Sequence, residues 1–161
     1  MIQTIIGKRG RGKTTLAKQF IKESTAAQIH ILDFLGEYHD LNDDRLTIAR
    51  DSLYGFCQFA WESSSPRFKT LVVFDEIDLY GKNDPHISFL YRYGRHKALD
   101  LIGVSRRFYD LPVIIRALTD EFCLFQITEE RDTNYLKRFI SDDILSKIIH
   151  LGNYQYIKIP L

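Results

Sequence analysis

Short apolar runs alternate with amphipathic segments along most of the 161 residues of this chain. Apolar runs bounded by polar residues are typical of buried strands, and apolar residues three or four positions apart indicate helices. The expected strands are Ile2–Ile6, Gln28–Leu32, Leu71–Phe74, Asp100–Val104, Phe122–Gln126 and Gln155–Ile159, with a shorter one at Thr47–Ala49. The expected helices are Lys13–Glu23, Leu53–Glu62, His86–Arg95, Pro112–Leu118 and Asp132–Ile149, the last either continuous or broken near Ser141.

This alternation predicts an α/β fold in which helices cover both faces of a mostly parallel sheet. The length is enough for one domain with a sizeable core and too short for two, so residues 1–161 are expected to form a single domain. A hydrophobic fraction of 45% and an aromatic fraction of 13% agree with a globular chain.

A phosphate-binding loop follows the first expected strand. The segment Gly7–Thr15 runs glycine, four residues, glycine, lysine and threonine, and it lies between a strand and a helix as this motif requires. Backbone N–H groups of such a loop form a nest for anions at a helix N-terminus. Lys13 is expected to reach the β- and γ-phosphates of ATP, and the Thr14 hydroxyl to ligate Mg²⁺. The other candidates for phosphate contact are Gly7, Gly10, Arg11, Gly12 and Thr15.

Two of these candidates also have simpler interpretations, because Arg11 could be a solvated charge and Thr15 an ordinary helix-packing residue. The glycines are required because a Cβ would block the close approach of phosphate to the backbone. The motif and its context predict a P-loop NTPase, a three-layer αβα sandwich around a mostly parallel central sheet.

A second motif ends an apolar strand in carboxylates. The continuous apolar run before Asp75 and Glu76 is typical of a buried parallel strand, and ligands in open α/β sheets bind at the carboxyl ends of strands. Asp75 is therefore expected to help hold Mg²⁺. Glu76 is expected to orient or deprotonate the attacking water, the alternative being a surface acid beyond the strand end.

A third strand end carries polar residues where a sensor of the γ-phosphate would lie. The strand from Leu99 ends in Ser105 and Arg106. Either side chain can lie between the γ-phosphate and the attacking water. The alternative is a plain strand end with a solvated arginine.

Composition narrows the setting of the protein. No apolar run approaches the roughly 20 residues of a membrane span, and the early first strand leaves no room for a signal peptide. Cys57 and Cys123 lack metal-site spacing and indicate reduced core thiols of an intracellular protein. A net charge of +1 gives no global basic signal, so charge alone does not indicate nucleic-acid binding.

Several segments, in order, resemble the FtsK–HerA class of P-loop ATPases, which pump DNA. They are the phosphate loop, the segment Asp33–Tyr38 (similar to D-x-x-G-E-Y), the acidic strand, the block from Gly94 through Arg106, and the segment from Phe125 to Leu136. The resemblance runs nearly end to end. The class usually carries glutamine where this chain has Ser105 and Arg106, which leaves the identity of the γ-phosphate sensor open.

The resemblance implies a ring, usually a hexamer, with nucleotide bound between subunits and an arginine finger supplied in trans. Such a finger contributes roughly 10³–10⁵ in rate. Arg95 matches the class's arginine before the sensor strand and is the first candidate. Arg92 and Arg116 are weaker candidates, and a surface charge is the alternative for each of the three.

The 161 residues have the size of the genome-packaging ATPases of viruses, and we expect none of the extra domains of cellular HerA-like translocases. This likeness implies an ATP- and Mg²⁺-dependent motor acting on double-stranded DNA, with capsid or membrane-associated viral proteins as further partners. The implied location is the host cytoplasm or the virion. The loop Gly81–His86 is a candidate for DNA contact, although an ordinary turn explains it more simply.

Three other functions compete with this one. A Zot-like assembly ATPase of filamentous phages would extrude DNA, but those proteins usually carry a membrane span. A small P-loop kinase would use the same loop, with Arg106 and Arg107 clamping the transferred phosphoryl group. Against a kinase, Asp75 and Glu76 favour water as the acceptor. A nucleotide-binding module without hydrolysis would not need this complete set of residues.

Overall fold

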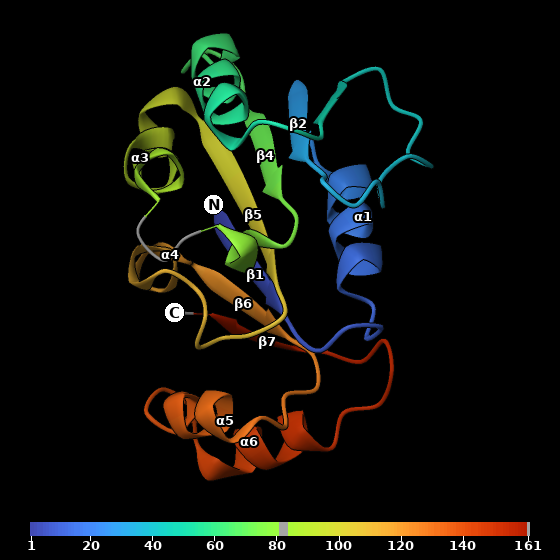
Figure 1. The fold of residues 1–161 in the computed structure, drawn as a ribbon, viewed down its shortest axis with the longest axis vertical. Helices are drawn as coiled ribbons and strands as arrows, with labels where there is room; N and C mark the ends of the chain where they lie inside the picture. The colour runs from blue at the N-terminus through green and yellow to red at the C-terminus, as the bar shows by residue number, and fades with distance from the viewer. Residues whose placement is uncertain (81–83, 161) are drawn as a thin grey trace.

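A mostly parallel sheet crosses the molecule between two layers of helices (Figure 1). The computed structural model describes residues 1–80 and 84–160, and in this part of the chain seven strands pair in the order β3-β2-β4-β5-β1-β6-β7. The strands are β1 (Ile2–Ile6), β2 (Gln28–Leu32), β3 (Leu46–Ala49), β4 (Thr70–Phe74), β5 (Leu99–Ser105), β6 (Glu121–Leu124) and β7 (Ile157–Pro160). All pair in parallel except β7, which runs antiparallel to β6 at the edge.

The helices divide between the two faces of the sheet. Figure 1 shows α1 on one side of the sheet and α2, α3 and α4 on the other, with α5 and α6 beyond β6 and β7. The α-helices are α1 (Lys13–Glu23), α2 (Leu53–Ser63), α3 (Pro85–Tyr93), α4 (Val113–Leu118), α5 (Glu130–Leu136) and α6 (Asp142–Ile149), and the 3-10 turns are η1 (Ile77–Leu79) and η2 (Gly94–Lys97). The predicted three-layer α/β architecture is confirmed.

Alternation along the central strands fills a hydrophobic core on each face. In β4, Val73 packs into the cluster on the α1 side, whereas Val72 and Phe74 pack into the cluster on the α2–α3 side. All three are fully buried. Burial on both faces explains why the central strands are continuous apolar runs in the sequence.

The sheet order brings the three expected motifs to one edge. Strand β5 lies between β1 and β4, so the end of β5 at Ser105 lies between the phosphate loop and Asp75. The backbone N–H of Gly7 donates to the carbonyl oxygen of Ser105 at 3.2 Å, and that of Asp75 to Leu32 at 3.1 Å. The ends of these parallel strands are thus fixed relative to one another before any ligand binds.

The largest difference from the sequence-based elements is in the last expected helix. Asp132–Ile149 is not one helix but two, α5 and α6, separated near the position where a break was considered. Ser141 caps α6, since its hydroxyl accepts a hydrogen bond from the N–H of Ile144 at 3.4 Å. Among the described residues, none of the helices is both long and apolar enough to cross a membrane.

Candidate functional site

The phosphate loop connects β1 to α1 and depends on glycine at two kinds of position. Gly10 and Gly12 have φ angles of 75° and 105°, which residues with a Cβ adopt only with strain. Gly7 needs space instead, because a Cβ there would lie 2.5 Å from Cβ of Phe125. The loop therefore curves tightly over Phe125 and directs its backbone toward the start of α1.

Lys13 is buried at the base of this loop. Its ammonium donates a hydrogen bond to the carbonyl oxygen of Lys8 at 3.1 Å. Burial lowers the pKa of Lys13, and the nearby carboxylates of Glu76 and Asp75 partly oppose that shift. The side chain is held inside the loop, the position from which a lysine contacts a bound phosphate.

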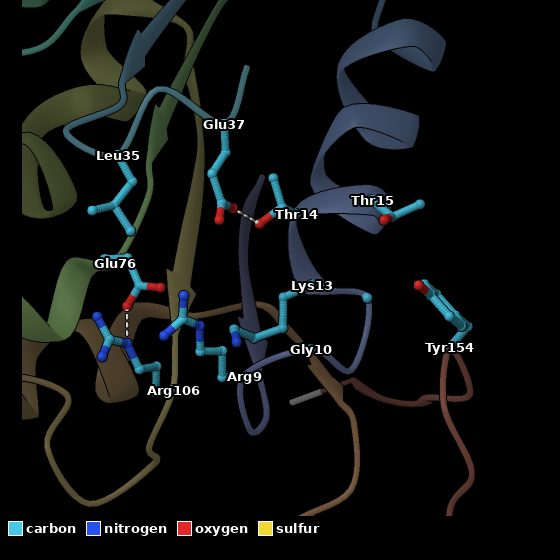
Figure 2. Close-up of a pocket in the computed structure, with 11 residues that line it drawn as sticks. Arg9, Gly10, Lys13, Thr14, Thr15, Leu35, Glu37, Glu76, Arg106 and Tyr154 are labelled. Carbon is cyan, nitrogen blue, oxygen red and sulfur yellow. Dashed lines mark hydrogen bonds and ion pairs between the residues drawn. The ribbon is translucent and has the colours of Figure 1, made fainter. Parts of the chain in front are cut away.

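Thr14, at the start of α1, hydrogen-bonds to an acid from a distant segment. Its hydroxyl donates to Oε2 of Glu37 at 2.6 Å, as drawn in Figure 2. Glu37 is fixed by buried Asp33, whose carboxylate accepts the backbone N–H groups of Glu37 at 2.9 Å and Tyr38 at 3.0 Å. The segment after β2 is thereby folded so that its glutamate faces the phosphate loop.

Asp75 is a buried carboxylate with neither oxygen hydrogen-bonded within the described residues. Burial raises its pKa to about 7, and the charges of Glu76, Glu37 and Asp33 add to the shift. An unpaired buried carboxylate is costly, and a bound cation compensates it. The oxygen donors of Asp75 and of the predicted ligand Thr14 are of the kind that a hard cation such as Mg²⁺ prefers.

Glu76 projects into the cavity from a strained backbone. Its φ of 51° is in the left-handed region, and this turn directs the side chain back toward the loop. The carboxylate forms an ion pair with Nε of Arg106 (Figure 2). The backbone N–H of Arg106 also donates to Oδ1 of Asp78 at 3.3 Å. Two of the predicted catalytic residues, Glu76 and Arg106, therefore face the same space.

Ser105 lies at the predicted position but its hydroxyl is turned inward. It is fully buried, and Oγ donates to the carbonyl oxygen of Arg107 at 2.9 Å while accepting the Arg107 N–H at 3.2 Å. The serine thus shapes the end of β5. Of the two sensor candidates, Arg106 is the one whose side chain reaches the cavity.

A cavity joins these groups into one site (Figure 2). Its lining residues are Arg9, Gly10, Gly12, Lys13, Thr14, Thr15, Leu35, Glu37, Glu76, Arg106 and Tyr154. Figure 2 shows Glu76 and Arg106 at one end and Tyr154 at the other, with Lys13 between them. The cavity is lined by cations of the loop, Arg9 and Lys13, and by two separate carboxylates, Glu37 beside Thr14 and Glu76 beside Arg106.

Other predicted residues lie outside this lining. The guanidinium of Arg11 donates to Oδ1 of Asn153 instead of facing the cavity. Arg95 lies in η2, just before β5, at the opposite edge of the sheet and exposed. Seven residues of β5, at about 3.3 Å each, place it roughly 20 Å from the site of its own chain. Of the candidate DNA-contact loop Gly81–His86, residues 81–83 lie outside the described residues.

The sequence analysis did not assign four lining residues, Arg9, Leu35, Glu37 and Tyr154. Glu37 was noticed only as part of a family-like segment, although a glutamate following a strand end was a usable signal. Arg9 lies within the phosphate loop and was interpreted as a solvated charge. Tyr154 is remote in sequence, and no local pattern indicated that it returns to the phosphate loop.

Comparison with known proteins gives one family and a consistent fold. Residues 1–108 match the family described as AAA domain. A search of curated protein sequences finds no match to the chain. Among solved structures, the genome packaging NTPase B204 of Sulfolobus turreted icosahedral virus 2, with AMPPCP bound, matches at a TM-score of 0.83 and 23% identity, covering 99% of this chain and 91% of that one.

Two further structures support the same fold. The DNA-packaging ATPase B204 of Sulfolobus turreted icosahedral virus matches at a TM-score of 0.79 and 20% identity, over 99% of this chain and 91% of that chain. EssC (ATPases 2 and 3) of Geobacillus thermodenitrificans matches at a TM-score of 0.69 and 15% identity, over 98% of this chain and 37% of that chain. The expected likeness in fold to viral genome-packaging ATPases is confirmed.

Proposed function

We propose, from the premise that this chain belongs to the AAA domain family, that it is an ATP-hydrolysing motor of the FtsK–HerA class that moves double-stranded DNA. Its role would be the packaging of a viral genome. Two of the solved structures that it resembles over most of their length are described as a genome packaging NTPase and a DNA-packaging ATPase. A fold shared at this identity does not carry a function by itself, so the residues of the site have to support it.

The observation that carries the proposal is the convergence of Lys13, Thr14 and Glu76 on one cavity at the carboxyl ends of β1 and β4, with the buried and unpaired carboxylate of Asp75 directly before Glu76 in the chain. A protein that only bound nucleotide would have no need of Glu76 beside the phosphate loop. A second cavity, which shares Arg9 and Arg106 with the first, is the place where a kinase would bind its acceptor. Glu76 lies beside the phosphate loop and favours water as the acceptor instead.

In this proposal the loop backbone and Lys13 bind the phosphates of ATP, and Thr14 and Asp75 hold Mg²⁺. When bound, Mg²⁺ would neutralise the negative charge that develops on the phosphate oxygens. Glu76 accepts a proton from the attacking water. Arg106 is the sensor, because a γ-phosphate near it competes with Glu76 for the guanidinium and so frees the carboxylate to act as base.

Assembly would complete the site. We propose a homo-oligomeric ring, a hexamer by analogy with the class, in which Arg95 of one subunit enters the site of the next. Arg95 is exposed and lies before the start of β5, at the opposite end of the strand from the site. This position supports contact with a neighbouring subunit and not with the site of its own chain. Arg116 supports this role less, since its guanidinium lies 4.5 Å from the ring centre of Tyr135 within the same subunit.

The other partners follow from the same proposal. Double-stranded DNA would pass through the ring, and capsid or membrane-associated viral proteins would anchor it. The setting would be the host cytoplasm or the virion. A near-neutral chain is compatible with DNA binding, because a few basic residues per subunit repeat around a ring.

The test is steady-state ATP hydrolysis with Mg²⁺, titrated with duplex DNA at several protein concentrations. Turnover that rises with DNA, and more than linearly with protein concentration, is the expected result for a ring with shared sites. Turnover indifferent to both would favour the kinase alternative and lead to a screen of acceptors. Absence of nucleotide binding and turnover under all conditions would contradict the proposal.

A further inference from the structure

The segment after α6 returns to the phosphate loop and presents an exposed aromatic ring there. Tyr154 is 68% exposed, yet the backbone around it is held in place. Its N–H donates to the carbonyl oxygen of Arg11 at 3.0 Å, and the Arg11 guanidinium donates to Oδ1 of Asn153. Tyr156 is partly buried and packs on Phe125 of the core cluster on the α1 side, with ring centroids 5.5 Å apart. The segment is therefore anchored on both sides of the exposed ring.

The backbone of Tyr154 is strained. Its φ of 62° is in the left-handed region, which bulky residues rarely occupy. The non-glycine residues with positive φ in the described part of the chain are Glu76, Ala98 and Tyr154, and two of these line the cavity. Strained positions that the surrounding structure maintains cluster at functional sites. The strain at Tyr154 thus points to a role for the direction of its side chain.

The ring of Tyr154 lies directly against the phosphate loop. A Cβ at Gly12 would be 2.6 Å from Cδ1 of Tyr154. Figure 2 shows the ring beside Thr15, across the cavity from Glu76 and Arg106. Gly12 therefore serves the contact with the ring as well as the turn of the loop.

We infer that the Tyr154 ring is the surface on which the base of a bound purine nucleotide stacks. The inference rests on the proposed function, which places the phosphates in the loop with the γ-phosphate toward Glu76. The ribose and base then leave toward the opposite end of the cavity, where Tyr154 lies. Three observations agree with this role. The segment packs on the phosphate loop, the ring is exposed, and a strained backbone directs the ring toward the cavity.

Stacking on one ring selects weakly among bases, because every base has a π-face. Among the described lining residues, the polar side chain that Figure 2 shows beside Tyr154 is that of Thr15, which has a single hydroxyl. Adenine and guanine differ in the donors and acceptors on their edges, and one hydroxyl distinguishes them poorly. The site should therefore bind ATP and GTP with similar affinity.

The test compares two ligands on the purified full chain by calorimetry with Mg²⁺. AMPPCP carries a base in addition to its phosphate chain, whereas tripolyphosphate is a phosphate chain alone. Tyr154→Ala should raise the Kd for AMPPCP about tenfold to a hundredfold and leave the Kd for tripolyphosphate unchanged. Tyr154→Phe, which keeps the ring, should stay close to wild type. Tyr54→Ala is the matched control, an exposed tyrosine on α2 outside the lining of this cavity.

A spectroscopic variant makes the same test independent of affinity. In Tyr154→Trp the new indole should change its fluorescence with AMPPCP and not with tripolyphosphate, against a background of the single natural tryptophan, Trp61. An unchanged Kd for AMPPCP in Tyr154→Ala would overturn the inference. So would equal losses for both ligands, which would assign Tyr154 to support of the loop. Failure of the wild type to bind either ligand would instead overturn the proposed function.

Discussion

The hydroxyl of Thr14 donates a 2.6 Å hydrogen bond to Glu37, across 23 residues of sequence and from a different segment of the fold. Asp33, buried at the end of β2, fixes the loop that carries Glu37 through two backbone hydrogen bonds. The predicted metal-ligating hydroxyl is therefore oriented by an acid before any metal is bound. This relationship gives the family-like segment Asp33–Tyr38 a physical role in the site.

Replacing Glu37 should weaken Mg²⁺ binding. Partners that orient a metal ligand typically change metal affinity or activity by about ten- to a hundredfold when they are removed. Glu37→Ala should raise the Mg²⁺ concentration for half-maximal ATP hydrolysis by about that factor, and Glu37→Gln by less, because the amide oxygen still accepts the hydrogen bond. The control is Asp40→Asn, which removes an exposed acid two residues after the segment Asp33–Tyr38. Asp40 is paired with Lys18 of α1. Equal Mg²⁺ dependence in Glu37→Ala and wild type would exclude this role.

Neutralising Asp75 should stabilise the ligand-free protein while abolishing hydrolysis. The folded state holds the Asp75 proton up to a pKa of about 7, against 3.8 for an ordinary aspartate. Between these two values the folded state binds more protons than the unfolded state. The free energy of unfolding therefore falls as pH rises from about 4 to 7, and above pH 7 the effect of Asp75 no longer changes with pH.

The stability of Asp75→Asn should therefore exceed that of wild type at pH 8, by up to about 4 kcal/mol for a shift of this size. The advantage should largely disappear near pH 4. Urea unfolding at pH 5 and pH 8 measures it, with the exposed Asp44→Asn as control. The same pH dependence in Asp75→Asn and wild type would show that Asp75 does not carry this cost.

Substitutions of Lys13 and Glu76 should both reduce ATP turnover but should differ in their effect on ATP binding. Lys13→Ala and Glu76→Gln should each lower ATP turnover by at least about a hundredfold, the usual contribution of such groups. Only Glu76→Gln should keep tight binding of ATP, since Glu76 acts on water and Lys13 on phosphate. Calorimetry with AMPPCP separates the two. Wild-type turnover in Glu76→Gln would show that another group is the base.

Arg95 should act only between subunits. Arg95→Ala should lower turnover in assembled protein and leave nucleotide binding by the monomer unchanged. Mixing Arg95→Ala with Lys13→Ala subunits should restore part of the activity, because each supplies what the other lacks. Arg67→Ala is a suitable control, since it removes another exposed arginine from the loop that enters β4. No rescue at any mixing ratio would count against a trans arginine at this position.

Much of the fold was predictable because local signals agreed. The apolar run of β4 and the spacing of the phosphate loop each define a strand end, and parallel pairing then brings those ends together. What could not be predicted depends on long-range contacts. The break between α5 and α6 was expected only as an alternative, because the amphipathic pattern continues through it.

The same limit applies to the site. Lys13, Thr14, Asp75 and Glu76 belong to motifs with fixed spacing, so their types and places follow from sequence. The inward turn of the Ser105 hydroxyl and the direction of the Arg11 side chain depend on neighbouring side chains and backbone. Tyr154 reaches the loop through the antiparallel edge of the sheet, which no local pattern specified.

The most direct test of the account is movement along DNA. A third-strand oligonucleotide bound to linear duplex DNA reports translocation, since a motor that tracks the duplex displaces it. We expect displacement with ATP and wild-type protein, no displacement with AMPPCP, and none with Glu76→Gln. Hydrolysis of ATP without displacement, in protein that has assembled on the duplex, would contradict the proposal that this chain is a DNA translocase.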